Sequence, residues 1–209
     1  MDTDRFGCKA LRLFLMLIFV ALLAGCVRTP PVSYYQLSSR SDAVDVAGPA
    51  ASGQGFAVGL GPVQLPEYLE RIQLVSRTSA NQLQIMGDQR WAEPLATAMP
   101  RVLGEDLALL LGNARILRHP WVRSQPVDRQ VLVEILQFEG GPERAALLTA
   151  RWSLLDGAGK PLLAGQRSSF QVDAASGTEG LVAALSEALW RLAGEIAVRL
   201  GEPSTEHHP

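Results

Sequence analysis

The sequence has few of the residues from which most catalytic and metal sites are built. Its 209 residues include two cysteines and three histidines: Cys8, Cys26, His119, His207 and His208. No His-Glu-x-x-His or Gly-x-Ser-x-Gly motif is present, so neither a zinc hydrolase nor a serine nucleophile is predicted. Gly59-Leu60-Gly61 lacks the third glycine of a dinucleotide-binding loop, and Pro62 follows where a helix would begin. We therefore predict that the protein is not an enzyme and holds no metal and no cofactor.

An excess of charge of one sign is also absent. The chain has 19 Lys and Arg residues and 21 Asp and Glu residues, a formal net charge of −2. Because binding to nucleic-acid phosphates needs clustered cations, no nucleic-acid partner is predicted. Neighbouring carboxylates such as Glu105 and Asp106 lie at helical spacing and are predicted to face solvent.

Long apolar runs are absent except near the N-terminus. There Arg5, Lys9 and Arg12 precede the apolar run Leu13–Ala24, LFLMLIFVALLA. A membrane-spanning helix needs roughly 20 apolar residues, so this run of about a dozen is typical of a secretory signal peptide. An uncleaved short anchor is the alternative. We predict that residues 1–25 are a signal peptide that is removed.

The apolar run ends in Leu23-Ala24-Gly25-Cys26, a lipoprotein cleavage motif. Cys26 is predicted to carry a diacylglyceryl group on its thiol and a further acyl chain, such as palmitate, on its amine. An ordinary signal peptide with an incidental Cys26 is the alternative. Cys8 lies in the removed segment, so no disulfide is expected. Val27, rather than Asp, follows Cys26, which favours a periplasmic protein anchored in the outer membrane.

The pattern of the remaining chain predicts one α+β domain. Residues 26–55 are predicted to comprise the lipidated cysteine, a tether, a first strand and a mobile loop; residues 56–203 the domain core; and residues 204–209 a polar tail. Alternating or β-branched stretches, separated by turn residues, predict strands. These strands are Tyr34–Leu37, Phe56–Val63, Gln73–Ser76, Gln82–Ile85, Arg129–Phe138, Ala145–Leu155 and Pro161–Val172.

Two stretches have the spacing of amphipathic helices. The first is Leu95–Leu111, in which Pro100 predicts either a kink or a later helix start. In the second, Ser176 and Glu179 form a capping-box pattern, and a leucine stripe runs on to Gly201. We predict that both helices pack on one face of a mostly antiparallel or mixed sheet.

Some large side chains are candidates for a partner-binding edge. Leucine, proline, tyrosine and arginine are concentrated in one short turn, and two tryptophans lie at loop or helix entrances. Trp, Tyr and Arg dominate protein interfaces, but the same aromatic residues can close one end of a core. The candidates are Leu65, Pro66, Tyr68, Arg71, Trp91 and Trp121.

The order of these motifs resembles a known family. Tyr34–Leu37 follows soon after Cys26, Val58–Arg77 reads VGLGPVQLPEYLERIQLVSR, and Arg90–Leu95 reads RWAEPL. Pro120-Trp121 and the closing leucine-rich helix complete the pattern. The chain resembles the PqiC-type auxiliary lipoproteins of MCE transport systems, also called ABC-type transport auxiliary lipoproteins.

This resemblance implies a function that composition and spacing do not. It implies a non-catalytic, periplasmic subunit, typically anchored in the outer membrane, that works with an MCE-domain protein in lipid transport between the two membranes. It also implies a homo-oligomer. The alternative from another functional class is a periplasmic carrier that binds a lipid or other hydrophobic ligand in its own cavity.

Overall fold

The computed structural model describes residues 14, 16, 31–40, 56–112, 114–122, 125–141 and 145–202. The predictions for the signal peptide, for lipidation of Cys26, for a mobile loop after residue 40 and for the tail at 204–209 lie outside the described residues. From Val32 onward the chain forms one unit. Its elements are β1 (Ser33–Tyr35), β2 (Ala57–Gln64), the 3₁₀ helix η2 (Glu67–Leu69), β3 (Gln73–Ser79), β4 (Gln82–Trp91), α2 (Leu95–Leu111), β5 (Arg115–Arg118), β6 (Arg129–Gly140), β7 (Ala145–Asp156), β8 (Pro161–Asp173) and α3 (Gly177–Gly201).

The strands form one mixed sheet in which β6 is central. On one side β6 pairs with the antiparallel strand β7, which in turn pairs with the antiparallel strand β8. On its other side β6 pairs with the parallel strand β2 at its beginning and meets β3 at its end. The parallel strand β5 extends the sheet beyond β2, while β4 and then β1 extend it beyond β3. The α+β fold with a mixed sheet is therefore confirmed.

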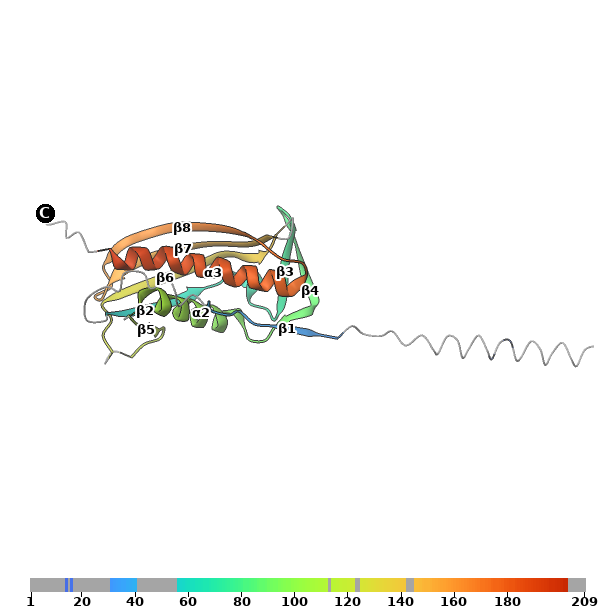
Figure 1. The fold of residues 1–209 in the computed structure, drawn as a ribbon, viewed down its shortest axis with the longest axis horizontal. Helices are drawn as coiled ribbons and strands as arrows, with labels where there is room; N and C mark the ends of the chain where they lie inside the picture. Colours follow the sequence, from blue (N-terminus) through green and yellow to red (C-terminus); the bar gives the residue numbers. More distant parts are fainter. Residues whose placement is uncertain are drawn as a thin grey trace, which may run out of the picture. The chain divides into compact units, whose positions relative to one another are not determined.

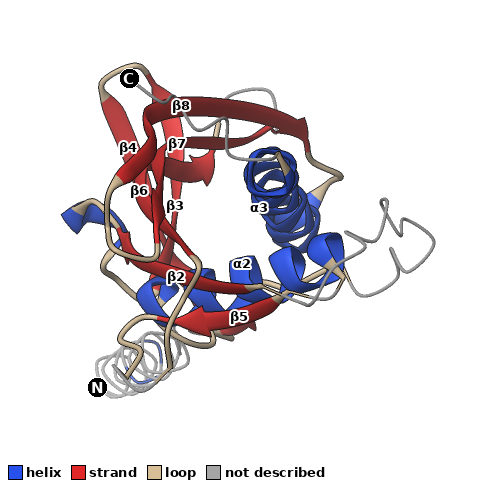
Figure 2. Ribbon diagram, turned by 90° about the vertical axis from the view of Figure 1, so that its left-hand side faces the viewer, coloured by secondary structure: helices blue, strands red, loops and turns tan. Residues whose placement is uncertain are grey.

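Both helices lie against the inner face of this curved sheet (Figures 1 and 2). α2 packs on β2 and β5, α3 packs on β6, β7 and β8, and the two helices pack on each other. Alternate residues of β6 supply the inner face, as at Val131, Val133 and Ile135, which are all buried. The pairing register shifts between Ile135 and Gln137, so the buried inner position passes to Phe138.

The leucine stripe of α3 faces the core as predicted. Leu185, Leu189 and Leu192 are buried in it. The capping-box prediction is wrong, because Ser176 is the N-cap residue but its side chain makes no capping hydrogen bond. The next residue, Gly177, has φ +86°, a left-handed conformation that departs from the helical geometry needed to bring a cap oxygen over the first turn.

Two local features differ from the sequence prediction. α2 begins at Leu95 and continues through Pro100, so a later helix start is wrong. β5 was not predicted: it is a short strand with arginine at both ends, and the hydrogen bonds that define it come from distant β2. Both predicted hairpins are confirmed, with turns at Ala80-Asn81 and at Gly157–Gly159.

Candidate functional site

The aromatic candidates do not meet at one end of the core. Tyr68 reaches Glu139 near the end of β6. Trp121 lies on Gly59, which pairs with Gln130 at the beginning of β6. Because each strand residue rises about 3.3 Å, Gln130 and Glu139 lie roughly 30 Å apart along β6. Trp91 is only 3% exposed and belongs to the core, so its position fits core closure and offers almost no surface to a partner.

The turn Leu65–Arg71 is held in shape by hydrogen bonds to its own backbone carbonyls, one of them from a side chain. Within η2 and its flanks, the Leu69 amide donates to the Pro66 carbonyl at 2.9 Å, and the Arg71 Nε donates to the Tyr68 carbonyl at 2.7 Å. Leu69 is buried and anchors the turn on the core, while Glu67 and Glu70 are exposed. The result is a fixed surface turn with an arginine and two carboxylates at its outside.

Tyr68 also covers a buried carboxylate. Glu139 is 1% exposed, and its carboxylate accepts hydrogen bonds from the Tyr68 hydroxyl, from Arg77 Nε at 2.5 Å and from Gln137 Nε2 at 3.1 Å. Burial, and secondly the hydrogen bond to Glu139, raises the pKa of the Tyr68 hydroxyl, so the phenol remains a donor. Tyr68 therefore has a structural role in addition to any role at the surface.

Trp121 explains why the Gly-Leu-Gly-Pro stretch needs its glycines. A Cβ on Gly59 would lie 2.8 Å from the Trp121 ring, and a Cβ on Gly61 would lie 2.9 Å from the Cβ of His119. Gly61 also has φ +110°, which side-chain-bearing residues rarely adopt. The ring of His119 meets that of Trp121 edge to face, with centroids 5.6 Å apart. The stretch is thus a close backbone approach, as the sequence indicates, and not a phosphate-binding loop.

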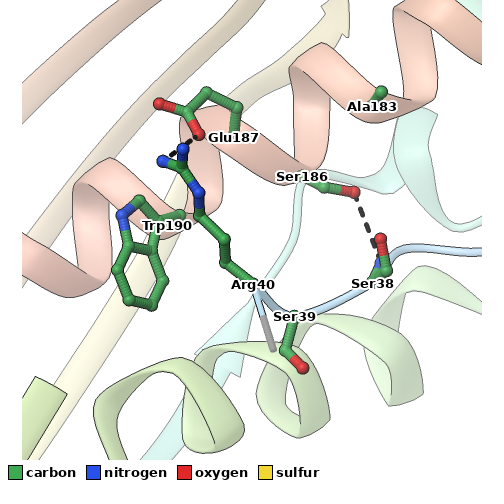
Figure 3. A pocket seen from close by; sticks show the side chains of 7 residues that line it. All are labelled: Ser38, Ser39, Arg40, Ala183, Ser186, Glu187 and Trp190. Atoms are coloured by element: carbon green, nitrogen blue, oxygen red, sulfur yellow. Dashed lines mark hydrogen bonds and ion pairs between the residues drawn. The ribbon is translucent and has the colours of Figure 1, made fainter. Parts of the chain in front are cut away.

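Residues 33–40, which we call the docked segment, lie between the predicted lipid anchor and the domain core and are held on the two helices. β1 pairs with β4, Leu37 inserts into the core, and the Ser38 amide donates to Ser186 Oγ at 3.3 Å. The Arg40 guanidinium pairs with Glu187 at 2.9 Å and stacks 5.9 Å from the centre of the Trp190 ring. Figure 3 shows how these side chains converge on a small pocket of about 220 Å³.

Asp106, on α2, also binds the docked segment. One of its oxygens, Oδ1, accepts the Arg40 amide at 3.1 Å, and the other, Oδ2, has no hydrogen-bond partner among the described residues. The sequence prediction that Asp106 faces solvent is wrong: the residue is fully buried, whereas Glu105 is exposed. Asp106 falls three and four positions after the buried Leu103 and Val102, so the helical spacing that places the leucines inside places Asp106 there too.

Neutralising Asp106 should stabilise the protein at neutral pH. Burial first, and then the negative charges of Glu105 and Glu187, raise the pKa of the Asp106 carboxyl from 3.8 to about 6, against the lowering effect of the Arg40 amide. The folded chain therefore binds the proton more tightly than the unfolded chain, and this group's contribution to stability falls as the pH rises from about 4 to 6. Asp106→Asn should gain on the order of 2–3 kcal/mol at pH 7 and little at pH 4.

Denaturant unfolding of the wild type and of Asp106→Asn at a series of pH values measures this difference directly. Asp173→Asn is the matched control because Asp173 is exposed. An equal gain for both variants, or a gain for Asp106→Asn that does not depend on pH, would contradict the assignment.

Two features that would point to other functions are absent from the described residues. They contain no group of three or more His, Cys, Asp or Glu residues arranged to hold a metal ion. None of their helices combines the length and apolarity needed to cross a bilayer.

Comparisons with known proteins identify the family. A family model described as the ABC-type transport auxiliary lipoprotein component matches residues 35–197. The crystal structure of an uncharacterised protein is similar with a TM-score of 0.67 and 20% identity, covering 82% of this chain and 99% of that one. A Xanthomonas campestris protein is similar with a TM-score of 0.65 and 15% identity, covering 79% and 93% of the two chains. These two structures support the fold alone, and no curated protein matches the chain. Because the family model matches from the last residue of β1, Tyr35, to Ala197 in α3, the chain belongs to the family of ABC-type transport auxiliary lipoprotein components.

Proposed function

We propose that the protein is a non-catalytic auxiliary subunit of an MCE-type system that transports lipid between two membranes. In this proposal it is periplasmic, is anchored in the outer membrane through lipid on Cys26, binds an MCE-domain protein and associates with further copies of itself. The observation that carries the proposal is the family match over residues 35–197, which includes all of α2 and most of α3.

The docked segment supports a role close to a membrane. The chain between Cys26 and the first residue of β1, Ser33, can span at most about 25 Å when fully extended. Residues 33–40 are fixed by strand pairing, by Leu37 in the core and by the Arg40–Glu187 ion pair. An anchor at Cys26 would therefore hold the domain near the membrane surface.

The packing favours a partner-binding role over a carrier role. The apolar stripes of α2 and α3 are buried against the sheet, so side chains fill the space in which a carrier would hold its ligand. The pocket beside Arg40 is about 220 Å³ and is lined by three serines, an arginine and a glutamate, together with Ala183 and Trp190. Pockets for drug-sized ligands measure roughly 300–1,000 Å³ and are mostly apolar, so this pocket suits neither the size nor the chemistry of a lipid.

The turn Leu65–Arg71 is the proposed contact with the MCE-domain protein. The hydrogen bonds from the Leu69 amide and from Arg71 Nε fix its shape before binding, which lowers the ordering cost. Pro66 and Arg71 are half-buried, and Glu67 and Glu70 are exposed beside them. Trp91 is too buried to contribute, and Trp121 lies too far along β6 to belong to the same surface.

Photo-crosslinking in intact cells tests this proposal. A photoreactive amino acid at Glu70 should form a covalent adduct with the MCE-domain protein, and one at the exposed β8 residue Arg167 should not. Arg71→Ala should weaken adduct formation at least about tenfold, the effect of losing a hot-spot contact. Arg71 is preferred to Tyr68 for this test because removing the Tyr68 hydroxyl disturbs the buried Glu139, whereas Arg71→Ala removes a single side-chain hydrogen bond to the Tyr68 carbonyl.

Melting of Arg71→Ala close to that of the wild type shows that the fold is intact. An adduct of Glu70 that survives Arg71→Ala unchanged, or equal adducts from Glu70 and Arg167, would refute the assigned surface. Absence of any MCE-domain protein among the adducts would refute the partnership.

A further inference from the structure

Two edge strands of the sheet, β5 and β8, have features that hinder pairing with another chain. β5 is short, and its two terminal arginines are exposed. β8 begins with Pro161, has a left-handed glycine at Gly165 with φ +63°, and exposes Arg167. Charged residues, proline and local bends are the usual means by which proteins keep an edge strand from pairing with another molecule.

Over Leu83–Met86 the margin formed by β4 lacks these features; its pairing with β3 shifts register only outside this stretch, between Gln82 and Leu83 and between Met86 and Arg90. On one side β4 pairs with β3 and on the other β1 covers only Gln89–Trp91, so Gln82–Asp88 has an unpaired side among the described residues. Figure 2 shows β4 as the outer strand on the side of the sheet away from α3. From Gln82 to Gly87 the strand has neither a charged residue nor proline, and Leu83 and Ile85 are 37% and 51% exposed.

We propose that this open edge of β4 is an interface between two copies of the chain. The two β4 strands pair antiparallel about a two-fold axis at Ile85, so that the two sheets become continuous. The inference rests on the self-association included in the proposed function, and it adds the surface and the register. It does not involve the Leu65–Arg71 turn.

The sequence of β4 is complementary to itself in this register. Ile85 lies opposite Ile85 of the partner subunit, and Leu83 lies opposite the partner's Gly87. A Cβ built on Gly87 meets nothing within 4 Å, so open space is present where the partner's leucine would pack. Asp88, the one acidic residue of the segment, lies opposite the partner's Gln82, so no like charges face each other across the axis.

A short strand pair buries little area, so this interface is weak in dilute solution. Anchoring by Cys26 would confine the copies to one membrane surface and raise their effective concentration, which strengthens a weak contact without any new one. The test therefore uses the full, processed chain in its membrane.

Cysteine cross-linking in the membrane tests the interface. Directly opposite residues of an antiparallel pair have Cβ atoms about 4.5–5.5 Å apart, close to the separation that a disulfide spans. Ile85→Cys should give a disulfide-linked dimer on mild oxidation. Val198→Cys, on the exposed side of α3 and 65% exposed, should give none, although its thiol is more accessible. Differently tagged Leu83→Cys and Gly87→Cys chains, expressed together, should cross-link to each other and so establish the register.

Introducing a charge at Ile85, on the proposed two-fold axis, provides a second test of the interface. Ile85→Lys places two ammonium groups opposite each other and should reduce recovery of a differently tagged copy at least about tenfold, with melting like that of the wild type. If Ile85→Cys and Val198→Cys chains cross-link equally, or if Ile85→Lys chains still associate normally, the β4 interface is refuted while self-association stands. If wild-type copies do not associate at all, self-association fails as well. If the photoreactive residue at Glu70 forms no adduct with an MCE-domain protein, only the proposed partnership is refuted, and the β4 interface is not affected.

Discussion

Shortening Leu189 to alanine is expected to lower the free energy of unfolding by about 2–5 kcal/mol. Leu189 is fully buried in α3, at the centre of the stripe that packs against α2 and the sheet. Removing its isobutyl group loses apolar burial and leaves a cavity that rigid neighbours on both sides cannot close. Denaturant unfolding monitored by the tryptophans measures the loss, and Leu185→Ala should behave similarly because Leu185 is 1% exposed.

The matched control lies on the opposite face of the same helix. Val198 is 65% exposed, and Val198→Ala should change the stability by no more than about 0.5 kcal/mol. Arg191→Ala should be tolerated to a similar extent because its ion pair with Glu187 is at the surface. Equal losses at Leu189 and Val198 would show that α3 is enclosed on all sides in the assembled protein.

Glu187 is a poorer control than the sequence indicates. Its position opposite the leucine stripe predicts a tolerant surface site. In the structure its carboxylate bridges Arg191 on the same helix and Arg40 on the docked segment. Periodicity identifies the outward face of a helix, but it does not show that another segment of the chain lies over that face.

Local patterns predicted the elements whose stability depends on their own side chains. The leucine stripe of α3 and the alternation in β6 each repeat over several turns or strand residues, so their period is unambiguous. The turn residues before β4 and before β8 likewise identified two hairpins. In each case the residues that define the element are neighbours in the sequence.

Features that depend on distant partners could not be predicted in this way. The carboxylate of Glu139 accepts hydrogen bonds from the Tyr68 hydroxyl and from the Arg77 guanidinium, which are both more than 60 residues away in the sequence. Glu139 follows the buried Phe138, and neighbouring strand residues face opposite sides of a sheet, so the sequence predicts that Glu139 points outward to solvent. Only the turn at Tyr68 and the neighbouring strand β3 bury it, and that arrangement follows from the sheet topology.

Breaking the ion pair of Glu139 is expected to destabilise the protein strongly. Arg77→Met should lower the free energy of unfolding by about 3–5 kcal/mol, because it leaves a buried carboxylate without its counter-charge. The Arg77 side chain is 23% exposed and that of Glu139 is fully buried, so water cannot easily replace the guanidinium. Urea unfolding of Arg77→Met at pH 7 gives the value.

The matched surface pair and a double variant separate this explanation from a simple loss of contacts. Arg151 pairs with Glu134 at 2.7 Å, but both side chains are about half exposed, and Arg151→Met should cost no more than about 1 kcal/mol. Adding Glu139→Gln to Arg77→Met removes the orphaned charge while keeping an acceptor for the Tyr68 hydroxyl and Gln137, so most of the lost stability should return. If the double variant is no more stable than Arg77→Met, the loss comes from packing of the arginine stem and not from an uncompensated buried charge.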